Sequence, residues 1–272
     1  MTRRAGKAVV LARGLGTRMR RPDETVPLDP AQAEAAAAGL KAMMSFGRPF
    51  LDYVLSGLAD AGVKEACLVI GPEHSAVREY YTKTAPPRRL RVAFAIQEKP
   101  FGTADAVLSA EEFTAGEEFL VINSDNIYPA SALSALAELS EPGVALFERD
   151  ALIAQSNIPP ERIASFAVCV VGADGYLEAI LEKPDEKTLA GIGPDSPVSM
   201  NCWRFSPAIF EACRRVPLSP RGELELPMAV REAMNEGVRF RVVRSREGVL
   251  DLSRRVDIAA VAERLRGITA NP

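Results

Sequence analysis

The stretch KAVVLARGLGTRMR at residues 7–20 decides the fold. A short apolar run leads straight into a turn that contains Gly14 and Gly16, and Thr17 and Arg18 follow it. Glycines let backbone amides approach a polyphosphate closely, and arginine supplies forked hydrogen-bond donors to phosphate oxygens. A strand that ends in such a glycine loop predicts a nucleotide-binding α/β fold.

Dinucleotide binding is the main alternative for a glycine loop in this position. The GxGxxG spacing of that fold is absent, and no acidic residue stands suitably at the end of a second strand. The loop alone leaves open which nucleotide is bound, so motifs elsewhere in the chain have to decide.

The composition suits one large α/β domain, or one domain with a subsidiary lobe, because 47% of the 272 residues are hydrophobic. The formal net charge of -3 offers no basic surface for a nucleic-acid backbone. No segment approaches the roughly 20 apolar residues of a membrane span, and the first apolar run is too short for a signal sequence. We therefore expect a cytoplasmic protein, with neither nucleic acid nor membrane as a partner.

The cysteines and the single histidine limit the kinds of catalytic mechanism that are possible. Cys67, Cys169, Cys202 and Cys213 lie in apolar patterns without CxxC spacing, which is typical of buried, reduced thiols. His74 is the only histidine, so mechanisms that need two histidines are excluded.

Short β-rich runs alternate with amphipathic stretches along the chain, which predicts a mostly parallel mixed sheet covered by helices, a three-layer α/β/α fold. The stretch from Pro49 to Gly62 predicts a helix with one apolar face, formed by Leu51, Val54, Leu55 and Leu58. The expected strands are Ala8–Ala12, Ala66–Ile70, Arg91–Ile96, Phe119–Asn123, Phe166–Val171, Tyr176–Leu181, Val198–Phe205 and Arg239–Arg244. Further helices are expected near Pro207–Arg214, Leu226–Glu236 and Val256–Arg266.

Residues 22–40 differ in composition from the rest. They are punctuated by proline and then run AQAEAAAA, which favours a short helix but offers little to bury. We interpret the segment as a surface insertion, either a mobile flap or a plain exposed helix.

Further motifs follow the glycine loop in a characteristic order. They are Lys41 ahead of Gly47, Arg48 and Pro49, QEKPFGTADAV from Gln97, VINSD ending at Asp125, LEKP from Leu181, MNCW from Met200, RGELELP from Arg221 and VLDLS around Asp251. This series resembles the sugar-1-phosphate nucleotidyltransferases, or NDP-sugar pyrophosphorylases, in particular the glucose-1-phosphate thymidylyl- and uridylyltransferases.

The resemblance implies a GT-A-like or Rossmann-like fold and a single nucleotidyltransferase domain over residues 1–272. The nucleotide-binding half would span about 1–125 and the sugar-phosphate-binding half about 126–272. The implied partners are a nucleoside triphosphate and a sugar 1-phosphate, and assembly into homo-oligomers is common among the relatives.

Magnesium is the cofactor that the resemblance implies, with Asp125 and Asp251 as its ligands. Asp125 follows the predicted strand 119–123, at the edge where α/β sheets place ligands. Carboxylate oxygens are ligands that Mg²⁺ prefers. Local sequence alone leaves alternatives open, since Asp125 would also suit a turn and Asp251 a helix N-cap. The magnesium hypothesis requires the two side chains to meet.

The resemblance also assigns the remaining site residues. Arg18, Lys41, Asp125 and Lys183 would be catalytic, with Arg18 on the leaving pyrophosphate. The nucleotide would be bound by Leu11, Ala12, Gly14, Gly16, Thr17, Gln97, Gly102 and Thr103. Glu182, Lys183 and Asn201 would bind the sugar phosphate. An amide such as Gln97 suits the imide edge of a pyrimidine, which favours dTTP or UTP.

Several positions depart from the family pattern. Arg13 stands in place of a small residue, Ser124 in place of a glycine, and Phe166–Ala167 in place of a Tyr-Gly pair. Ser253–Arg254 stands where relatives usually have glycine and threonine. These changes keep open a non-catalytic regulatory homologue and an acceptor such as phosphocholine. A glycosyltransferase of related architecture is disfavoured, because it would carry a DxD-like motif and lack the GxGTRM loop.

Overall fold

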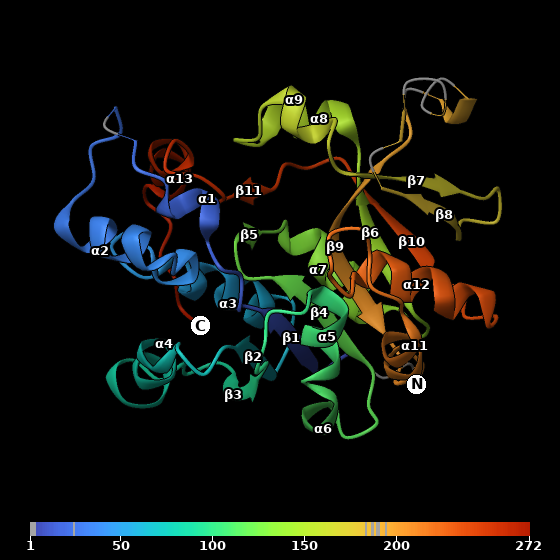
Figure 1. Cartoon of the computed structure of the whole chain (residues 1–272), viewed down its shortest axis with the longest axis horizontal. Helices are drawn as coiled ribbons and strands as arrows, with labels where there is room; N and C mark the ends of the chain where they lie inside the picture. The colour runs from blue at the N-terminus through green and yellow to red at the C-terminus, as the bar shows by residue number, and fades with distance from the viewer. Residues whose placement is uncertain (1–3, 24, 183, 186–187, 189–190, 194) are drawn as a thin grey trace.

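The computed structural model describes residues 4–23, 25–182, 184–185, 188, 191–193 and 195–272. At its centre lies a mixed sheet with the strand order β10-β6-β9-β4-β1-β2-β3, and the β7–β8 hairpin pairs with β9 (Figure 1). The strands are β1 (Lys7–Leu11), β2 (Glu65–Ile70), β3 (Arg91–Ile96), β4 (Phe119–Asn123), β6 (Gly143–Phe147), β7 (Ala167–Val171), β8 (Leu177–Leu181), β9 (Val198–Phe205) and β10 (Arg241–Ser245).

The sheet is mostly parallel. β1 pairs in parallel with β2 and β4, β2 with β3, and β10 with β6. β9 lies antiparallel between β4 and β6, so these two strands run in the same direction on either side of it. β9 is therefore the reversed strand in an otherwise parallel path, and it joins the first half of the chain to the second within one sheet.

Alternate strand residues face two apolar layers, because successive side chains of a strand point to opposite faces. Ala8 and Val10 of β1 belong to one buried cluster and Val9 to the other. The first layer includes residues of α3 (Phe50–Asp60), α7 (Ala130–Glu138) and α13 (Asp257–Leu265), and the second includes residues of α5 (Thr103–Leu108), α11 (Ala208–Arg215) and α12 (Leu226–Asn235). This arrangement confirms the expected three-layer α/β fold.

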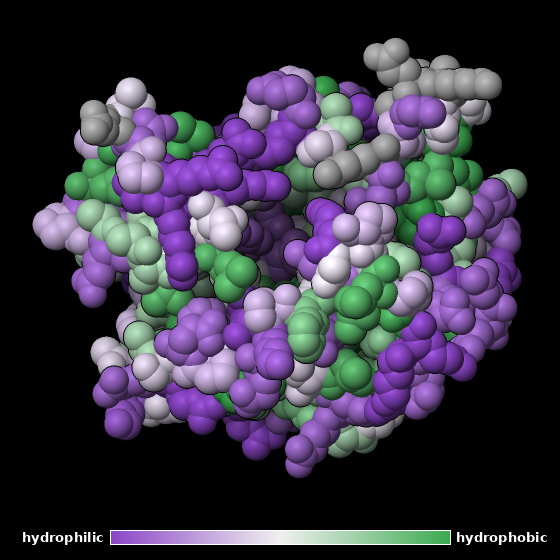
Figure 2. Space-filling model, viewed as in Figure 1, coloured by the Kyte–Doolittle hydropathy of each residue, from purple (hydrophilic) through white to green (hydrophobic). Residues whose placement is uncertain are grey.

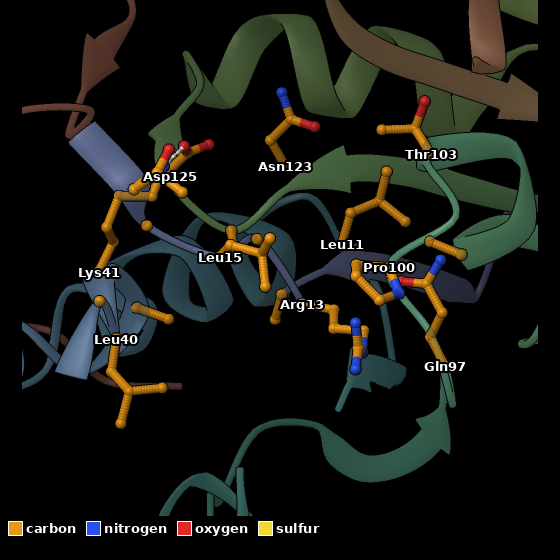
Figure 3. Close-up of a pocket in the computed structure, with 18 of the residues that line it drawn as sticks. Leu11, Arg13, Leu15, Leu40, Lys41, Gln97, Pro100, Thr103, Asn123 and Asp125 are labelled. Atoms are coloured by element: carbon orange, nitrogen blue, oxygen red, sulfur yellow. Dashed lines mark hydrogen bonds and ion pairs between the residues drawn. The ribbon is translucent and has the colours of Figure 1, made fainter. Parts of the chain in front are cut away.

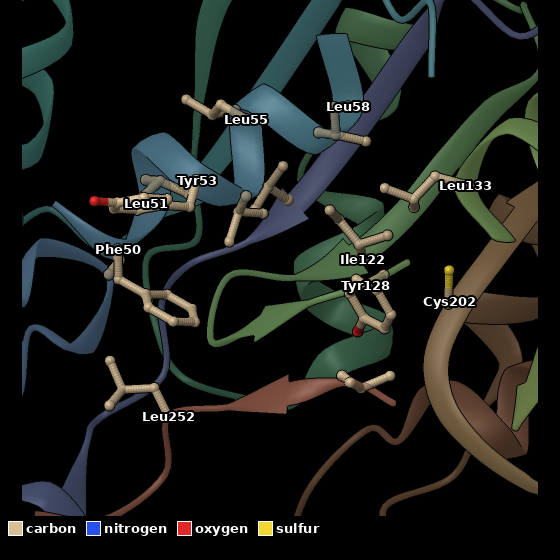
Figure 4. Close-up of a cluster of buried hydrophobic side chains, with 14 of the residues drawn as sticks. Phe50, Leu51, Tyr53, Leu55, Leu58, Ile122, Tyr128, Leu133, Cys202 and Leu252 are labelled. Carbon is tan, nitrogen blue, oxygen red and sulfur yellow. The ribbon is translucent and has the colours of Figure 1, made fainter. Parts of the chain in front are cut away.

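The first layer is built around α3, whose apolar face packs on the sheet and on α7 (Figure 4). Leu55 and Leu58 of α3 lie near Ile122 of β4 and Leu133 of α7 in the same cluster. The helix ends where Gly62 adopts a positive φ of 82°, a conformation that favours glycine.

The remaining elements among the described residues are short. They are α1 (Thr17–Arg20), α2 (Pro30–Ala38), the 3₁₀ helix η1 (Lys41–Met43), α4 (Ser75–Glu79), the π-helix η2 (Tyr80–Thr84), α6 (Glu111–Thr114), β5 (Asn126–Ile127), α8 (Arg149–Gln155), α9 (Pro160–Ile163) and β11 (Leu250–Asp251). In α2, Asp29 and Gln32 form a capping box, and Ala35 and Ala36 are buried.

The strands over 91–96, 119–123 and 198–205 have the boundaries expected from the sequence, and the other expected elements are shifted by one or two residues. β6 was not predicted. Its five residues are all buried, and a short apolar run is compatible with either a strand or a buried helix segment.

All four cysteines are buried and free, as expected. Burial raises the pKa of the Cys67, Cys169 and Cys213 thiols to about 12. In the described residues, no helix has the length and apolar character that crossing a membrane requires.

Candidate active site

A cavity of about 490 Å³ opens at the carboxyl ends of β1, β3 and β4 (Figure 3). α/β sheets bind ligands at this edge because connecting loops of parallel strands gather there. The cavity brings together most of the predicted site residues: Leu11, Ala12, Gly14, Gly16, Thr17, Lys41, Gln97, Gly102, Thr103, Asp125 and Asn201. Its other lining residues include Arg13, Asn123, Ser124 and Glu223.

Two glycines of the cavity wall are required by close packing. Gly16 has a φ of 60°, and a Cβ there would overlap the backbone of Gly39. Gly102 has a φ of 114°, and a Cβ there would overlap the backbone of Leu224. Both glycines let the cavity wall approach a neighbouring segment without a side chain between them.

At one end of the cavity, Lys41 of η1 forms an ion pair with Asp125, which follows β4 (Figure 3). Both side chains are partly buried, with exposed fractions of 17% and 22%. The partly buried Lys41 ammonium group is a cationic hydrogen-bond donor. The Asp125 carboxylate beside it offers oxygen atoms that can bind a cation.

Asp251 lies next to Asp125 because β11 pairs antiparallel with β5. Asp251 is opposite Asn126 in this short ladder, and the Leu252 amide donates a hydrogen bond of 2.9 Å to the Asp125 carbonyl. Burial, followed by the nearby charge of Asp125, raises the pKa of Asp251 to about 6. The ladder thus brings Asp251, in β11, close to Asp125, which precedes β5, and the like charges of the two carboxylates repel each other.

The Asp251 side chain is held from two sides and does not line the cavity. Arg162 Nη2 donates to Oδ1 at 2.8 Å, and Asn126 Nδ2 donates to Oδ2 at 3.1 Å. Arg162 also bonds Asp257, at 3.1 and 3.2 Å, and Asn157 exchanges two hydrogen bonds with the Asp251 backbone. Sequence reasoning missed Asn126, Asn157 and Arg162. Adjacency to Asp125 was a signal for Asn126, and no local pattern marked the other two.

Asp125 and Asp251 are the carboxylates in this part of the structure that could hold a hard divalent cation. Asp251 Oδ1 and Oδ2 accept hydrogen bonds from Arg162 and Asn126, respectively, and a carboxylate oxygen has two lone pairs. A cation beside both carboxylates would offset their repulsion. Within the described residues, no group of three or more His, Cys, Asp or Glu side chains is placed to hold a metal ion. Mg²⁺ is commonly held by one or two carboxylates together with waters and substrate phosphates.

The opposite end of the cavity contains a buried amide. Gln97 Nε2 donates to the Gly102 carbonyl at 3.0 Å and to Asp105 Oδ2 at 2.7 Å. Both amide hydrogens are therefore used within the protein, and the Gln97 carbonyl oxygen, at the cavity, accepts no hydrogen bond from the described residues. Thr103 lines the same end, and its Oγ1 accepts the Leu226 amide at 2.9 Å.

Comparison with known proteins agrees with this geometry. The model of the nucleotidyl transferase family matches residues 7–249. The chain belongs to this family. The UTP–glucose-1-phosphate uridylyltransferase AglF of Haloferax volcanii is 26% identical over 260 residues, covering 96% of each chain. A glucose-1-phosphate thymidylyltransferase of Streptomyces griseus is 28% identical over 235 residues, covering 85% of this chain and 58% of the relative.

Solved structures share the fold at lower sequence identity. A UDP-glucose pyrophosphorylase complexed with UDP-glucose superposes with a TM-score of 0.75 and 16% identity, covering 96% of this chain and 98% of that one. A UTP-bound enzyme of the same kind from Acinetobacter baumannii gives 0.73 and 16%, covering 98% and 96%. These likenesses confirm the large, mostly parallel sheet of the nucleotidyl transferase fold.

Some of the expected site residues of this nucleotidyl transferase lie away from the main cavity. Arg18 lines a neighbouring cavity with three other arginines. Glu182 is exposed and is not among the lining residues of the main cavity, while Lys183 lies outside the described residues. Asp251 does not line the main cavity, as described above.

The residues that depart from the family pattern lie at different places in the structure. Arg13 is buried in the cavity wall, where Nη2 donates to Glu73 Oε2 at 3.4 Å and to the Glu98 carbonyl at 3.2 Å. Ser124 is buried, and its amide donates to Leu11 at 3.2 Å. Phe166 packs against the first core layer. Arg13 thereby ties the glycine loop to the segments around β2 and β3.

Proposed function

We propose that this nucleotidyl transferase forms a nucleotide sugar and pyrophosphate from a nucleoside triphosphate, UTP or dTTP, and a sugar 1-phosphate. An oxygen of the acceptor phosphate attacks the α-phosphorus, and the bond between that phosphorus and the oxygen bridging to the β-phosphate breaks. The electron pair and the negative charge leave with pyrophosphate. The relatives named for uridylyl and thymidylyl transfer to glucose 1-phosphate support this substrate class.

The observation that supports the proposal is that Lys41 and Asp125 form an ion pair at the end of the glycine-loop cavity, while the ladder of β5 and β11 brings Asp251 close to Asp125. Charge accumulates on the phosphoryl oxygens during transfer, so fixed cations around them are the main source of catalysis. Mg²⁺, when bound by the two aspartates, would supply further positive charge at this point. Lys41 orients an α-phosphate oxygen by a charge-assisted hydrogen bond.

The base would lie at the other end of the cavity. The free acceptor oxygen of Gln97 needs an N–H donor, and the imide N–H of uracil or thymine supplies one. Leu11, Ala12 and the glycine loop would contact the nucleotide. Asn201, Glu182 and Lys183 would receive the sugar phosphate, in the half of the chain that follows about residue 125.

A matrix of four nucleoside triphosphates and several acceptor phosphates tests the proposal through magnesium-dependent release of pyrophosphate. We expect release with UTP or dTTP and a sugar 1-phosphate, and a loss of at least about 10³-fold in kcat for Asp125→Ala, because a principal charge partner in the transition state is removed. Glu178→Ala, at an exposed site in β8, is the matched control.

The other arms of the same assay separate the alternatives. Release only with phosphocholine would replace the sugar acceptor by an alcohol phosphate. Ligand-dependent thermal stabilisation without release across the whole matrix would identify a non-catalytic nucleotide-binding homologue.

A further inference from the structure

Arg13 is a buried cation in the wall of the main cavity. It stands in the glycine loop where the family has a small residue, and 7% of its side chain is exposed. The main cavity opens near β5 and β9, where Figure 2 shows a hollow beside hydrophilic side chains. Figure 3 shows Arg13 on the side of Gln97, with Lys41 and Asp125 at the other end.

The hydrogen-bonding groups of Arg13 are only partly used. Nη2 donates to the Glu98 carbonyl at 3.2 Å and to Glu73 Oε2 at 3.4 Å. Nε and Nη1 are buried and have no hydrogen-bond partner among the described residues. A guanidinium group carries five N–H donors and keeps its proton, so its buried donors need acceptors. Buried donors without a partner are rare in folded proteins, and they point to a partner that binds from outside the chain.

The missing partner of Arg13 is a hydrogen-bond acceptor rather than a second anion. Arg13 Nη2 lies 3.4 Å from both carboxylate oxygens of Glu73, so a negative charge already faces the guanidinium group. A neutral acceptor, such as a keto oxygen, would satisfy the unused donors without adding further negative charge. The phosphates of the proposed substrate would lie at the other end of the cavity, beside Lys41.

Gln97 supplies the complementary group at the same end. Glu98, whose carbonyl holds Arg13, directly follows Gln97 in the chain. The side-chain oxygen of Gln97 accepts no hydrogen bond from the described residues, because both bonds of this amide are made by Nε2. This end of the cavity therefore offers one acceptor together with cationic donors. A ring that has an N–H group beside a keto oxygen can pair with both.

We propose that Arg13 is a specificity-determining residue that donates a hydrogen bond to a keto oxygen of the bound base. The inference rests on the proposed function, which places the base beside Gln97. Uracil, thymine and guanine have a ring N–H next to a keto oxygen, whereas cytosine and adenine have no hydrogen on the corresponding ring nitrogen. A site with buried polar groups rejects a ligand that leaves them unpaired. The small residue of the relatives could not supply these side-chain donors.

Calorimetric binding of nucleoside monophosphates to the full chain tests the proposal without turnover and without the outer phosphates. We expect Arg13→Met, which keeps most of the side-chain volume, to weaken UMP binding by about tenfold, the loss expected for one hydrogen bond from a charged donor. The affinity for CMP should be unchanged. Arg78→Met, at an exposed arginine of the nearby helix α4, is the control for the loss of one positive charge.

Thio-substituted nucleotides identify the oxygen that Arg13 contacts. Sulfur is a weaker acceptor than oxygen, so replacing the contacted oxygen should remove most of the difference between the wild type and Arg13→Met. An effect with 4-thio-UMP would assign the contact to O4, and an effect with 2-thio-UMP would assign it to O2. Either result supports the proposal, and no effect with either analogue contradicts it.

Equal weakening of UMP, CMP and ribose 5-phosphate in Arg13→Met would overturn the proposal, because Arg13 would then only hold the glycine loop in place. An unchanged affinity for UMP would overturn it as well. Arg13→Ala, which restores a small residue, is the second variant, and thermal unfolding checks that both variants fold.

The inference and the proposed function can fail separately. A wild type that prefers UMP to CMP through Arg13 but releases no pyrophosphate with any acceptor would refute the proposed function alone. Release of pyrophosphate from UTP, with the preference for UTP over CTP unchanged in Arg13→Met, would refute the role of Arg13 alone.

Discussion

At the scale of single residues, Asn201 has a strained backbone conformation at a position that lines the main cavity. It is a non-glycine residue with a φ of 56°, and it lines the main cavity from within β9. Left-handed backbone is unfavourable for residues with a Cβ, and such strain is retained at sites where a side chain is needed. The MNCW motif indicated a functional asparagine, but its backbone conformation depends on the sheet and had no signal in the sequence.

Substitution of Asn201 separates the two contributions. We expect Asn201→Ala to be less stable than Asn201→Gly by about 1 kcal/mol, because glycine adopts this φ without strain. Both variants should lose activity with sugar 1-phosphate to a similar degree, since both lack the amide. Denaturant unfolding and steady-state kinetics measure the two effects. If the glycine variant kept full activity, the side chain would have no role in the reaction.

At the scale of elements, the short ladder of β5 and β11 depends on a buried ionic network. Arg162 at α9 bonds Asp251 of β11 and Asp257 of α13, and all three side chains are at least nine-tenths buried. Asp257 Oδ2 also accepts the amides of Ser253 and Arg254, at 2.9 and 2.7 Å. Sequence motifs located both aspartates of the proposed metal site, but their proximity arises from the long-range pairing of β5 with β11, which no local pattern encodes.

Removing the arginine from this network should destabilise the fold strongly. We expect Arg162→Met to lower the free energy of unfolding by about 3–5 kcal/mol at pH 7, because two buried carboxylates lose their common counter-charge. Chemical denaturation followed by circular dichroism measures the change. Arg149→Met, in the neighbouring helix α8, serves as the comparison, and a similar small loss in both variants would contradict the role given to the network.

At the scale of the whole molecule, β9 links the two halves of the chain into one sheet with apolar layers on both faces. Alternation of strand and helix patterns predicted these layers. The order of the strands could not be read from the sequence, since a reversed β9 between β4 and β6 is set by packing at long range. Cys202 lies in the first layer, whereas Cys67, Cys169 and Cys213 lie in the second.

The cysteines therefore report whether the layers unfold together. We expect no thiol to react in the native protein at pH 8, since all four are buried and burial raises their pKa. In increasing urea, all four should become reactive at one midpoint, because both layers share the same strands. Site-resolved labelling by mass spectrometry measures this. Earlier exposure of Cys202 would instead indicate two separately unfolding units.

The ladder between β5 and β11 also bears on how the protein is made. Asn126 and its bonding partner Asp251 are 125 positions apart, and chains emerge from the ribosome N-terminus first. The ribosome would thus have synthesised the glycine loop and Asp125 well before Asp251. Under the proposed function, the nascent chain could not consume triphosphate before the segment around Asp251 had been synthesised and had paired with β5.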